Sequence, residues 1–392
     1  MISYKGESMG KILKNKNDSK ALKAFALSSL LNDLGSDSIK PFWPLFVTNV
    51  LGAPVSILGV LDGFGEAISY GIRWPAGWLS DKVKKRKIFI WFGYLIAGLS
   101  RIGYAFSSNV AILFPLKAMD RLGKIRDPPR DALLSDIVKK KEKGSAFGIL
   151  NAADNIGAML GPLFGLFIFS ILSYTGLFLV AAIPSFISVA VILFFVKEKK
   201  IKIKQNRKVK LDLIFKKFLI SGIAFALSWI SISFLILWAN RAGFEVTLLP
   251  FLLFTCSGFS ALGSYLFGKL SDGIGRKKTL GFNYLLFSIS LFSIAAFGNS
   301  HPILFSVLLF IIYGLCFGGV TSLHSAFITD IVTKERQAEA LGMFSTLFGF
   351  SSFGASTIAG ILWEVASPEI AFLVAGSFAF LGFLLLMLFV KK

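Results

Sequence analysis

Apolar runs of about 20 residues, each long enough to cross a bilayer as a helix, recur from one end of this chain to the other. Helices and closed barrels are the backbone structures that span hydrocarbon, because they satisfy their own polar groups. Charged residues are 16% of the 392 residues, whereas a soluble protein carries about 25%. The sequence therefore predicts an all-α membrane protein.

Lysine and arginine alternate between the connections of these runs. Basic clusters follow every even-numbered run, whereas the other connections hold almost none, with Arg241 as the exception. Cytoplasmic loops collect Lys and Arg, so we expect both termini inside and a multi-pass protein of the cell membrane. The net charge of +20 then reflects topology and a lipid bilayer partner, not nucleic acid. Twelve transmembrane helices are expected, near 24–50, 55–79, 88–107, 109–137, 145–172, 176–196, 213–240, 246–269, 279–298, 302–331, 337–364 and 369–390.

These spans group into two halves joined by a basic connection. We expect a cytoplasmic N-terminal tail over 1–23, a six-helix bundle over 24–196, a basic cytoplasmic linker over 197–212, and a second six-helix bundle over 213–390. An internal repeat supports this division. Gly77-Trp-Leu-Ser-Asp81 recurs as Gly268-Lys-Leu-Ser-Asp272 at an offset of 191 residues, and Ser135-Asp136-Ile-Val138 recurs as Thr329-Asp330-Ile-Val332 at an offset of 194.

The first repeated motif resembles the Gly-x-Leu-x-Asp-(Arg/Lys)-x-Gly-(Arg/Lys)-(Arg/Lys) signature of the major facilitator superfamily. The second copy matches through Gly275 and Arg276, whereas the first has Lys84 in place of the second glycine. The stretch from Asp120 to Leu133 is also similar to prokaryotic drug or sugar efflux permeases. This resemblance implies two pseudo-symmetric bundles, transport by alternating access, and a central cavity lined by spans one, four, seven and ten.

The signature loops imply a cytoplasmic latch in which a carboxylate meets the positive N-terminal end of a neighbouring helix. We expect Arg86 and Arg276 to pair with cytoplasmic carboxylates or anionic lipid; the alternative is a simple topological anchor. The residues assigned to this gate are Gly77, Asp81, Arg86, Gly268, Asp272, Gly275 and Arg276.

Span five carries Gly157, Gly161 and Gly165 at every fourth position, with Pro162 among them. Three glycines on one helix face permit close backbone approach, and the proline adds a bend. The element resembles Gly-x-x-x-Gly-Pro-x-x-Gly, common in exporters of the superfamily, and that resemblance alone favours export.

Charges within spans are costly and are functional candidates by default. Acids and bases in the first half are nearly balanced, which predicts a paired network, and part of it is expected to be structural. The proton-coupling candidates are Asp33, Asp37, Glu66 and Asp154. The first-half candidates for the substrate cavity are Asn32, Lys40, Lys117, Arg121, Lys124 and Arg130.

The second half offers an aromatic and polar wall. Its cavity candidates are Trp229, Trp238, Asn240, Tyr313 and His324, although a lone buried histidine is more often a packing residue.

A proton-coupled exporter of small amphipathic organic molecules is the leading prediction, acting as a monomer without a cofactor. No nucleotide-binding Gly-x-x-x-x-Gly-Lys-(Ser/Thr) pattern occurs, so energy would come from a gradient. The alternatives are an uptake symporter for a small, possibly anionic metabolite, a non-transporting membrane sensor, and a divalent-metal exporter using Asp33, Asp37 and Glu66. The scarcity of His and Cys disfavours soft metals. No nucleophile–base pair suggests an enzyme.

Overall fold

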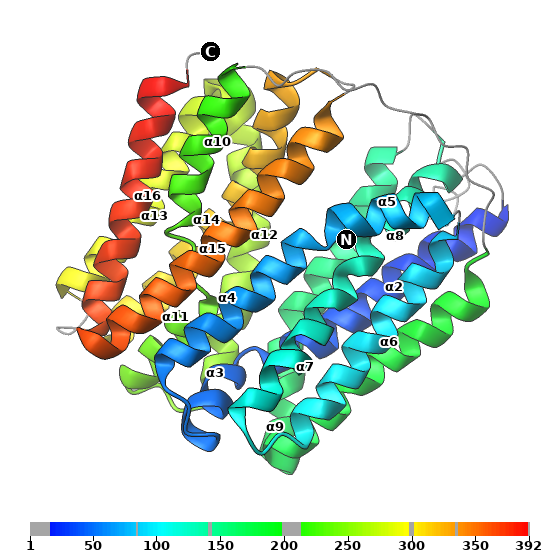
Figure 1. The fold of residues 1–392 in the computed structure, drawn as a ribbon, viewed down its shortest axis with the longest axis horizontal. Coiled ribbons are helices and arrows are strands. Elements are labelled where there is room, and N and C mark those ends of the chain that lie inside the picture. The colour runs from blue at the N-terminus through cyan, green and yellow to red at the C-terminus, as the bar shows by residue number, and fades with distance from the viewer. Residues whose placement is uncertain are drawn as a thin grey trace, which may run out of the picture. The chain divides into compact units, whose positions relative to one another are not determined.

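The computed structural model describes residues 16–83, 85–139, 143–197, 213–297, 302–333 and 336–390 (Figure 1). Helices make up nearly all of these residues, and none of them lies in a β-strand. The predicted all-α class is therefore confirmed. By contacts, the chain groups into a first unit of residues 1–39, 72–107 and 115–204 and a second unit of residues 40–71, 108–114 and 205–392.

In the first unit, α2 and α6 both pack along the long helix α9. The core that they share is apolar and includes Leu22, Phe25, Ile90, Tyr94 and Ile192. The helices of this unit are α2 (Lys16–Ile39), α5 (Arg73–Val83), α6 (Arg86–Ala105), most of α7 (Val110–Leu122), the 3-10 helix η2 (Gly123–Arg126), α8 (Asp127–Ile137) and α9 (Lys143–Phe195).

In the second unit, α12 packs on α14, α13 on α16, and α4 on α15. The helices of this unit are α3 (Trp43–Leu45), the π-helix η1 (Phe46–Val50), α4 (Val55–Gly71), α10 (Leu213–Ala226), α11 (Ile232–Arg241), α12 (Leu249–Ile274), α13 (Arg276–Phe297), α14 (Pro302–Ile331), α15 (Gln337–Val365) and α16 (Pro368–Phe389). Figure 1 shows α4 running alongside α15.

The two units follow from contacts, whereas the two predicted halves follow from the repeat. Residues 40–71 join the second unit because α4 packs closely against α15. Within the linker, residues 198–212 lie outside the described residues. The division into halves at 197–212, the tail over 1–23 and the pseudo-twofold relation remain predictions.

Several predicted spans are broken rather than continuous. In span four, Pro128 and Pro129 have no N–H to donate to the carbonyls of Lys124 and Ile125, so α-helical bonding lapses and η2 intervenes. The predicted connection between spans five and six shrinks to a kink in α9, where Ser173 alone leaves helical geometry at φ 56° and ψ −162°.

Span seven breaks between α10 and α11, over Leu227–Ser231, without a proline or glycine. Serines on α15 bind the backbone groups that the break releases. The Ser352 hydroxyl donates to the carbonyl of Trp229 across 2.9 Å, and the Ser231 N–H donates to the Ser356 hydroxyl across 3.0 Å. Hydrocarbon offers no such partners, so buried serines make this break possible.

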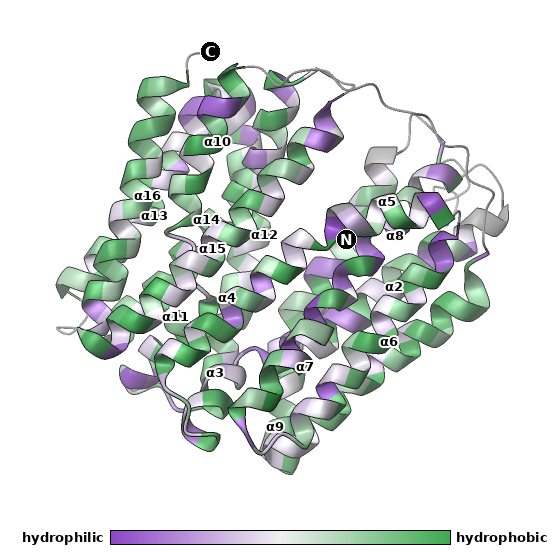
Figure 2. Ribbon diagram, viewed as in Figure 1, coloured by the Kyte–Doolittle hydropathy of each residue, from purple (hydrophilic) through white to green (hydrophobic). Residues whose placement is uncertain are grey.

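Seven helices of the described part are long and apolar enough to cross a membrane: α6, α9, α12, α13, α14, α15 and α16. The broken spans contain shorter helices, so a criterion of helix length does not identify them as membrane spans. The count of twelve spans stays a prediction. Figure 2 shows mostly hydrophobic helices, with hydrophilic residues gathered on α5 and α8. Large apolar side chains such as Phe167 and Phe194 are exposed, as expected where lipid replaces water.

Candidate functional site

A network of charged side chains lies in the first unit, on α2, on the broken helix α7–η2–α8, and on α9. The break after α7 places Arg126 in a buried position, where its guanidinium lies 4.8 Å from the centre of the Tyr94 ring. Its Nη1 donates to the carbonyl of Gly123 across 2.8 Å, and its Nε lies 3.6 Å from Oδ1 of Asp127. Arg73 of α5 approaches the same carboxylate at 4.0 Å.

Arg130 is the centre of this network. Its Nε donates to Oδ1 of Asp131 across 3.0 Å, its Nη1 lies 3.8 Å from Oδ2 of Asp154, and Nη1 also donates to the hydroxyl of Ser29. The guanidinium therefore joins α8 to α9 and α2. Two predicted site residues, Arg130 and Asp154, are thus brought together from separate helices. A close pair of this kind can bind a proton or a polar solute group only by rearranging.

Asn32 links a buried cation to Asp33. The side chain of Arg101 is fully buried and donates to the hydroxyl of Ser185 across 2.7 Å and to the carbonyl of Ala181 across 3.0 Å. Its Nη2 also reaches Oδ1 of Asn32 at 3.3 Å, while Nδ2 of Asn32 donates to Oδ1 of Asp33 across 3.1 Å. Hydrogen bonds in such a series polarise one another, so the charge of Arg101 acts on Asp33 through a neutral amide.

The three predicted bases of span four do not share one continuous helix. Lys117 is buried and Arg121 half-buried on α7, where Nε of Arg121 lies 3.6 Å from the neighbouring Asp120. Lys124 lies on η2, beyond the point where the helix changes to 3-10 geometry. The expected spacing of i, i+4 and i+7 therefore no longer describes a single helix face.

The other predicted acids are spread over both units. Asp37, on α2, is buried, and Glu66, on α4, is half-buried. Lys40 is exposed just beyond the end of α2. The spacing of Asp33 and Asp37 by one helical turn is retained, but only Asp33 remains partly accessible.

A cluster of aromatic rings occupies the second unit around the break in span seven. The ring of Trp229 lies 5.7 Å from Tyr313, 5.5 Å from Phe287 and 5.4 Å from Phe317, centre to centre. Trp229 and Tyr313, both predicted, thus meet in one place. Trp229, Tyr313 and Phe287 are buried, whereas Phe317 is 38% exposed, so part of one apolar ring is available to an amphipathic solute.

His324 is buried at the edge of the same cluster. Its Nε2 lies 2.5 Å from the hydroxyl of Tyr284, and its ring lies 4.7 Å from Phe344. These contacts are those of a packed histidine with one polar partner. The other two predicted residues, Trp238 and Asn240, lie on α11. Trp238 packs edge-on against Phe372 with ring centres 5.5 Å apart, and Asn240 donates to the carbonyl of Phe244 across 3.0 Å.

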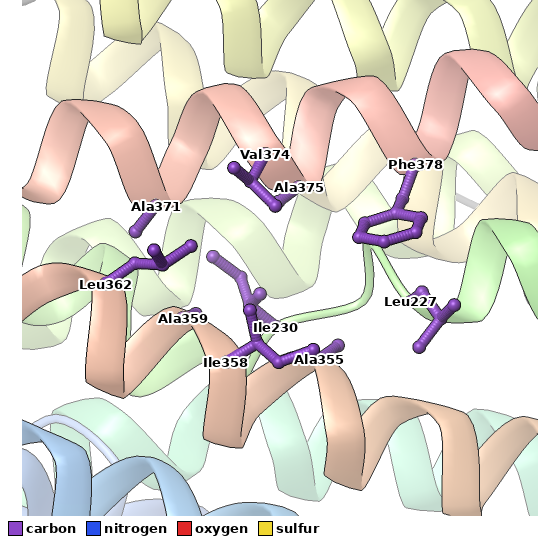
Figure 3. A pocket seen from close by; sticks show the side chains of 10 residues that line it. All are labelled: Leu227, Ile230, Ala355, Ile358, Ala359, Leu362, Ala371, Val374, Ala375 and Phe378. Atoms are coloured by element: carbon purple, nitrogen blue, oxygen red, sulfur yellow. The ribbon is translucent and has the colours of Figure 1, made fainter.

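An apolar pocket lies beside the break in span seven (Figure 3). Ten apolar side chains line it, and none of them is a polar side chain that could orient a solute. They come from the break, from α15 and from α16: Leu227, Ile230, Ala355, Ile358, Ala359, Leu362, Ala371, Val374, Ala375 and Phe378.

Asp62 is a buried residue that is not among the predicted site residues. On α4, its Oδ1 accepts a hydrogen bond from the indole N–H of Trp43 across 2.9 Å, and its Oδ2 accepts from the hydroxyls of Ser231 and Ser233. The available signal was an acid within an apolar run, flanked by Gly59 and Gly63. Its partners lie far away in sequence and were not identifiable.

The repeated motifs form matching ion pairs in both units. Nη1 of Arg86 lies 2.7 Å from Oδ2 of Asp136, and Nε of Arg276 lies 3.1 Å from Oδ2 of Asp330. Each pair joins the two repeated motifs of its own half.

The latch itself remains a prediction: Asp272 is exposed, and the side chain of Asp81 lies outside the described residues. Gly77 and Gly268 lie within α5 and α12, while Gly275 ends α12 at φ 92°, a conformation that favours glycine.

The glycines of span five pack α9 against α2. A Cβ added at Gly165 would collide with the carbonyl of Ser38, and one at Gly157 would collide with that of Leu30. At Gly161 it would lie 2.6 Å from Cβ of Asp37. This close approach holds the helix that carries Asp33 against the helix that carries Asp154, and Pro162 lies inside the same stretch.

Within the described residues, no group of three or more His, Cys, Asp or Glu side chains is arranged to hold a metal ion. Cys256 and Cys316 are free and buried.

Comparison with known proteins places this architecture in a family. The family model described as Major Facilitator Superfamily matches residues 25–272 and 217–392. The MFS-type transporter MJ1317 of Methanocaldococcus jannaschii is 35% identical over 393 residues, covering 95% of this chain and 96% of that protein. Multidrug resistance protein MdtG of Proteus mirabilis is 28% identical over 289 residues, covering 69% of this chain and 71% of its own.

Solved structures share the fold at low sequence identity. A bacterial homologue of the human lysosomal transporter Spinster, inward-facing and unoccupied, has a TM-score of 0.79 at 14% identity and covers 96% of this chain and 97% of its own. The nucleoside transporter NupG has a TM-score of 0.80 at 14% identity and covers 95% of this chain and all of its own. The chain belongs to the major facilitator superfamily and is a multi-pass membrane transporter, not an enzyme.

Proposed function

We propose that this protein is a proton-coupled exporter of small amphipathic organic compounds that works by alternating access. It acts as a monomer in the cell membrane, with both termini cytoplasmic. The observation that carries the proposal is the series Arg101–Asn32–Asp33: a partly accessible carboxylate on α2 held by an amide that a buried guanidinium polarises. In this proposal, neutralising Asp33 weakens the hydrogen bond from Nδ2 of Asn32 and so loosens the series that ends at Arg101.

The aromatic cluster supports an amphipathic substrate. Trp229 lies in the break of span seven and meets Phe287 of α13 and Tyr313 and Phe317 of α14. Discontinuous helices are where transporters commonly place their substrate sites. Export is supported by the names of two relatives, the multidrug resistance proteins MdtG of Proteus mirabilis and MdtH of Aeromonas hydrophila, and by the glycine element of α9.

A flux assay in proteoliposomes tests the proton coupling and the substrate class. Purified protein is reconstituted, a pH gradient is imposed in either direction, and the fluorescence of ethidium, an amphipathic cation, is followed. We expect ethidium to accumulate on the side that loses protons, and not in protein-free vesicles. A thermal-shift screen of other amphipathic compounds then defines the preferred class. Equal fluxes with and without the gradient would contradict proton coupling. If no compound that stabilises the protein is transported, transport of this class of compound would be contradicted.

An uptake symporter for an anionic metabolite is the second candidate, because α7, η2 and α8 carry more bases than acids. The five bases are Lys117, Arg121, Lys124, Arg126 and Arg130, and the four acids are Asp120, Asp127, Asp131 and Asp136. Carboxyfluorescein, an amphipathic anion, replaces ethidium in the same vesicles. Movement of this anion together with protons would favour uptake over export.

A further inference from the structure

Asp62 is the shared acceptor of donors from two parts of the chain that are far apart in sequence. Trp43 of α3 binds Oδ1, whereas Ser231 and Ser233, at the start of α11, bind Oδ2. Asp62, Trp43 and Ser233 are all buried. An ionised carboxylate offers about four acceptor positions, so these donors satisfy most of its capacity and offset the cost of burying the charge.

The helix that carries Asp62 approaches its neighbour closely on either side of the carboxylate. A Cβ added at Gly59 would collide with the carbonyl of Ser356, and one at Gly63 would lie 2.8 Å from the ring of Phe353. Ser356 also accepts from the N–H of Ser231, so the same residue of α15 contacts both α4 and the break in span seven. The segment of α3 and α4 is thereby fixed to the second half of the chain.

The two carboxylate oxygens of Asp62 bind residues from different predicted halves of the chain. Oδ1 bonds to Trp43, which belongs to the same half, and Oδ2 bonds to serines of the other half. Alternating access requires contacts between the halves to form and break at each end of the protein in turn. Hydrogen bonds to Oδ2 are suited to this, because water can replace neutral hydroxyl donors at a modest net cost.

We propose that Asp62 is a gating residue: it closes this end of the transporter by binding Ser231 and Ser233, and these bonds break when that end opens. Trp43 is a positioning residue that keeps the carboxylate pointed at the two serines. The proposal rests on the alternating access proposed above, but not on proton coupling, direction or substrate.

Distances between spin labels test the gate directly. Cysteines replace Asn49 and Glu245, two exposed residues that follow α3 and α11 on the same side of Asp62. Native Cys256 and Cys316 are buried and free. The distance distribution between the labels is then recorded in detergent and in liposomes for the parent protein and for four variants.

We expect Asp62→Asn and the double variant Ser231→Ala with Ser233→Ala to raise the ratio of long to short distances about tenfold, since each weakens charge-assisted bonds to Oδ2. Trp43→Phe should produce a smaller increase, because the bonds to the serines remain. Ser228→Ala should produce none: that hydroxyl is buried in the same break but donates to the carbonyl of Phe225.

Unchanged distributions in a folded Asp62→Asn protein would overturn the gate, as would a Ser228→Ala effect equal to that of the double variant. If Asp62→Asn does not fold, the serine double variant and Trp43→Phe decide in its place, because each removes neutral groups only. The parent protein could fail to transport ethidium while the variants still show the expected order of distances. That result would contradict the proposed substrate and coupling but would support Asp62 as a gating residue.

Discussion

Arg86 and Asp136 form an ion pair of 2.7 Å between the start of α6 and the end of α8, and Asp136 belongs to the second motif of the internal repeat. The second copy of the repeat makes a similar pair between Arg276, one position out of register with Arg86, and Asp330 at 3.1 Å. A contact that recurs in both copies connects the two repeated motifs physically. Their separation of about fifty residues in each half places them on adjoining helix ends.

Removing the charge of either arginine should lower the free energy of unfolding, and the loss should be larger for the pair of Arg86 and Asp136. The side chain of Arg86 is 10% exposed, against 30% for Arg276, whereas Asp136 is 49% exposed and Asp330 37%. The predicted order therefore rests on the deeper burial of the first guanidinium. We expect Arg86→Gln to lower the free energy of unfolding by about 1 kcal/mol and Arg276→Gln by less. Thermal unfolding in detergent measures both. The reverse order would show that exposure does not control the strength of this contact.

The latch predicts that Asp272→Asn or Asp81→Asn shifts the protein toward inward-facing states and slows turnover. Loss of one contact between a carboxylate and a helix N-terminus should cost about 0.3–2 kcal/mol, which is enough to change nearly balanced populations. Distance distributions between spin labels on the two halves measure the shift. Distributions that match the parent in both variants would leave the motif as a topological anchor.

Replacing Asp33 by Asn should separate binding from coupling. Asparagine mimics the protonated carboxyl group and keeps its shape, so the variant should bind substrate and exchange it between equal pools. It should fail to concentrate ethidium under a pH gradient. Arg101 and Asn32 remain in place in this variant, so the fold should be retained.

Asp37 is the matched control for that experiment, one turn further along α2 and buried. If Asp37 only neutralises Lys40, which is exposed, Asp37→Asn should destabilise the protein little, and the protein with or without Lys40→Met should retain driven transport. Retained transport would eliminate Asp37 as the coupling site. Retention of driven transport by Asp33→Asn would eliminate Asp33 and direct attention to Glu66 and Asp154.

Alanine at Gly165 should destabilise the packing of α9 on α2. Its new methyl group would meet the carbonyl of Ser38, a backbone atom that cannot rotate away, and overpacking of this kind costs about 1–3 kcal/mol. Gly148, on the same helix, has no atom within 4 Å of an added Cβ, so Gly148→Ala should be neutral or stabilising. Equal thermal shifts for the two variants would contradict the close approach.

Single cysteines placed at Lys85, Lys141, Lys204 and Lys277 should all react with a membrane-impermeant maleimide from the cytoplasmic side. A cysteine at Asn49, in a connection that lacks basic residues, should react only from the opposite side. Cys256 and Cys316 are buried and should contribute little background labelling. Any one of the four lysine positions labelled reproducibly from outside would break the predicted topology.

The class of this protein and its family can be predicted from the amino-acid sequence. Apolar runs and the distribution of basic residues predict a multi-pass membrane protein because the bilayer imposes length and charge rules on every span. The repeated Gly-x-Leu-x-Asp motif and the glycines of span five led to the major facilitator superfamily, and the contact of Gly157, Gly161 and Gly165 with α2 follows from their spacing on one helix face.

Which polar groups meet cannot be predicted from the sequence and depends on how the helices pack. Spacing along a helix gives the face on which a side chain lies, but pairing across helices depends on helix rotation and on where each helix breaks. The breaks at Gly123–Arg126 and Leu227–Ser231 were not anticipated, and they set the positions of Arg126, Trp229 and Ser231. Asp62 shows the consequence most clearly: its serine partners lie 169 and 171 residues away, and no local pattern could connect them.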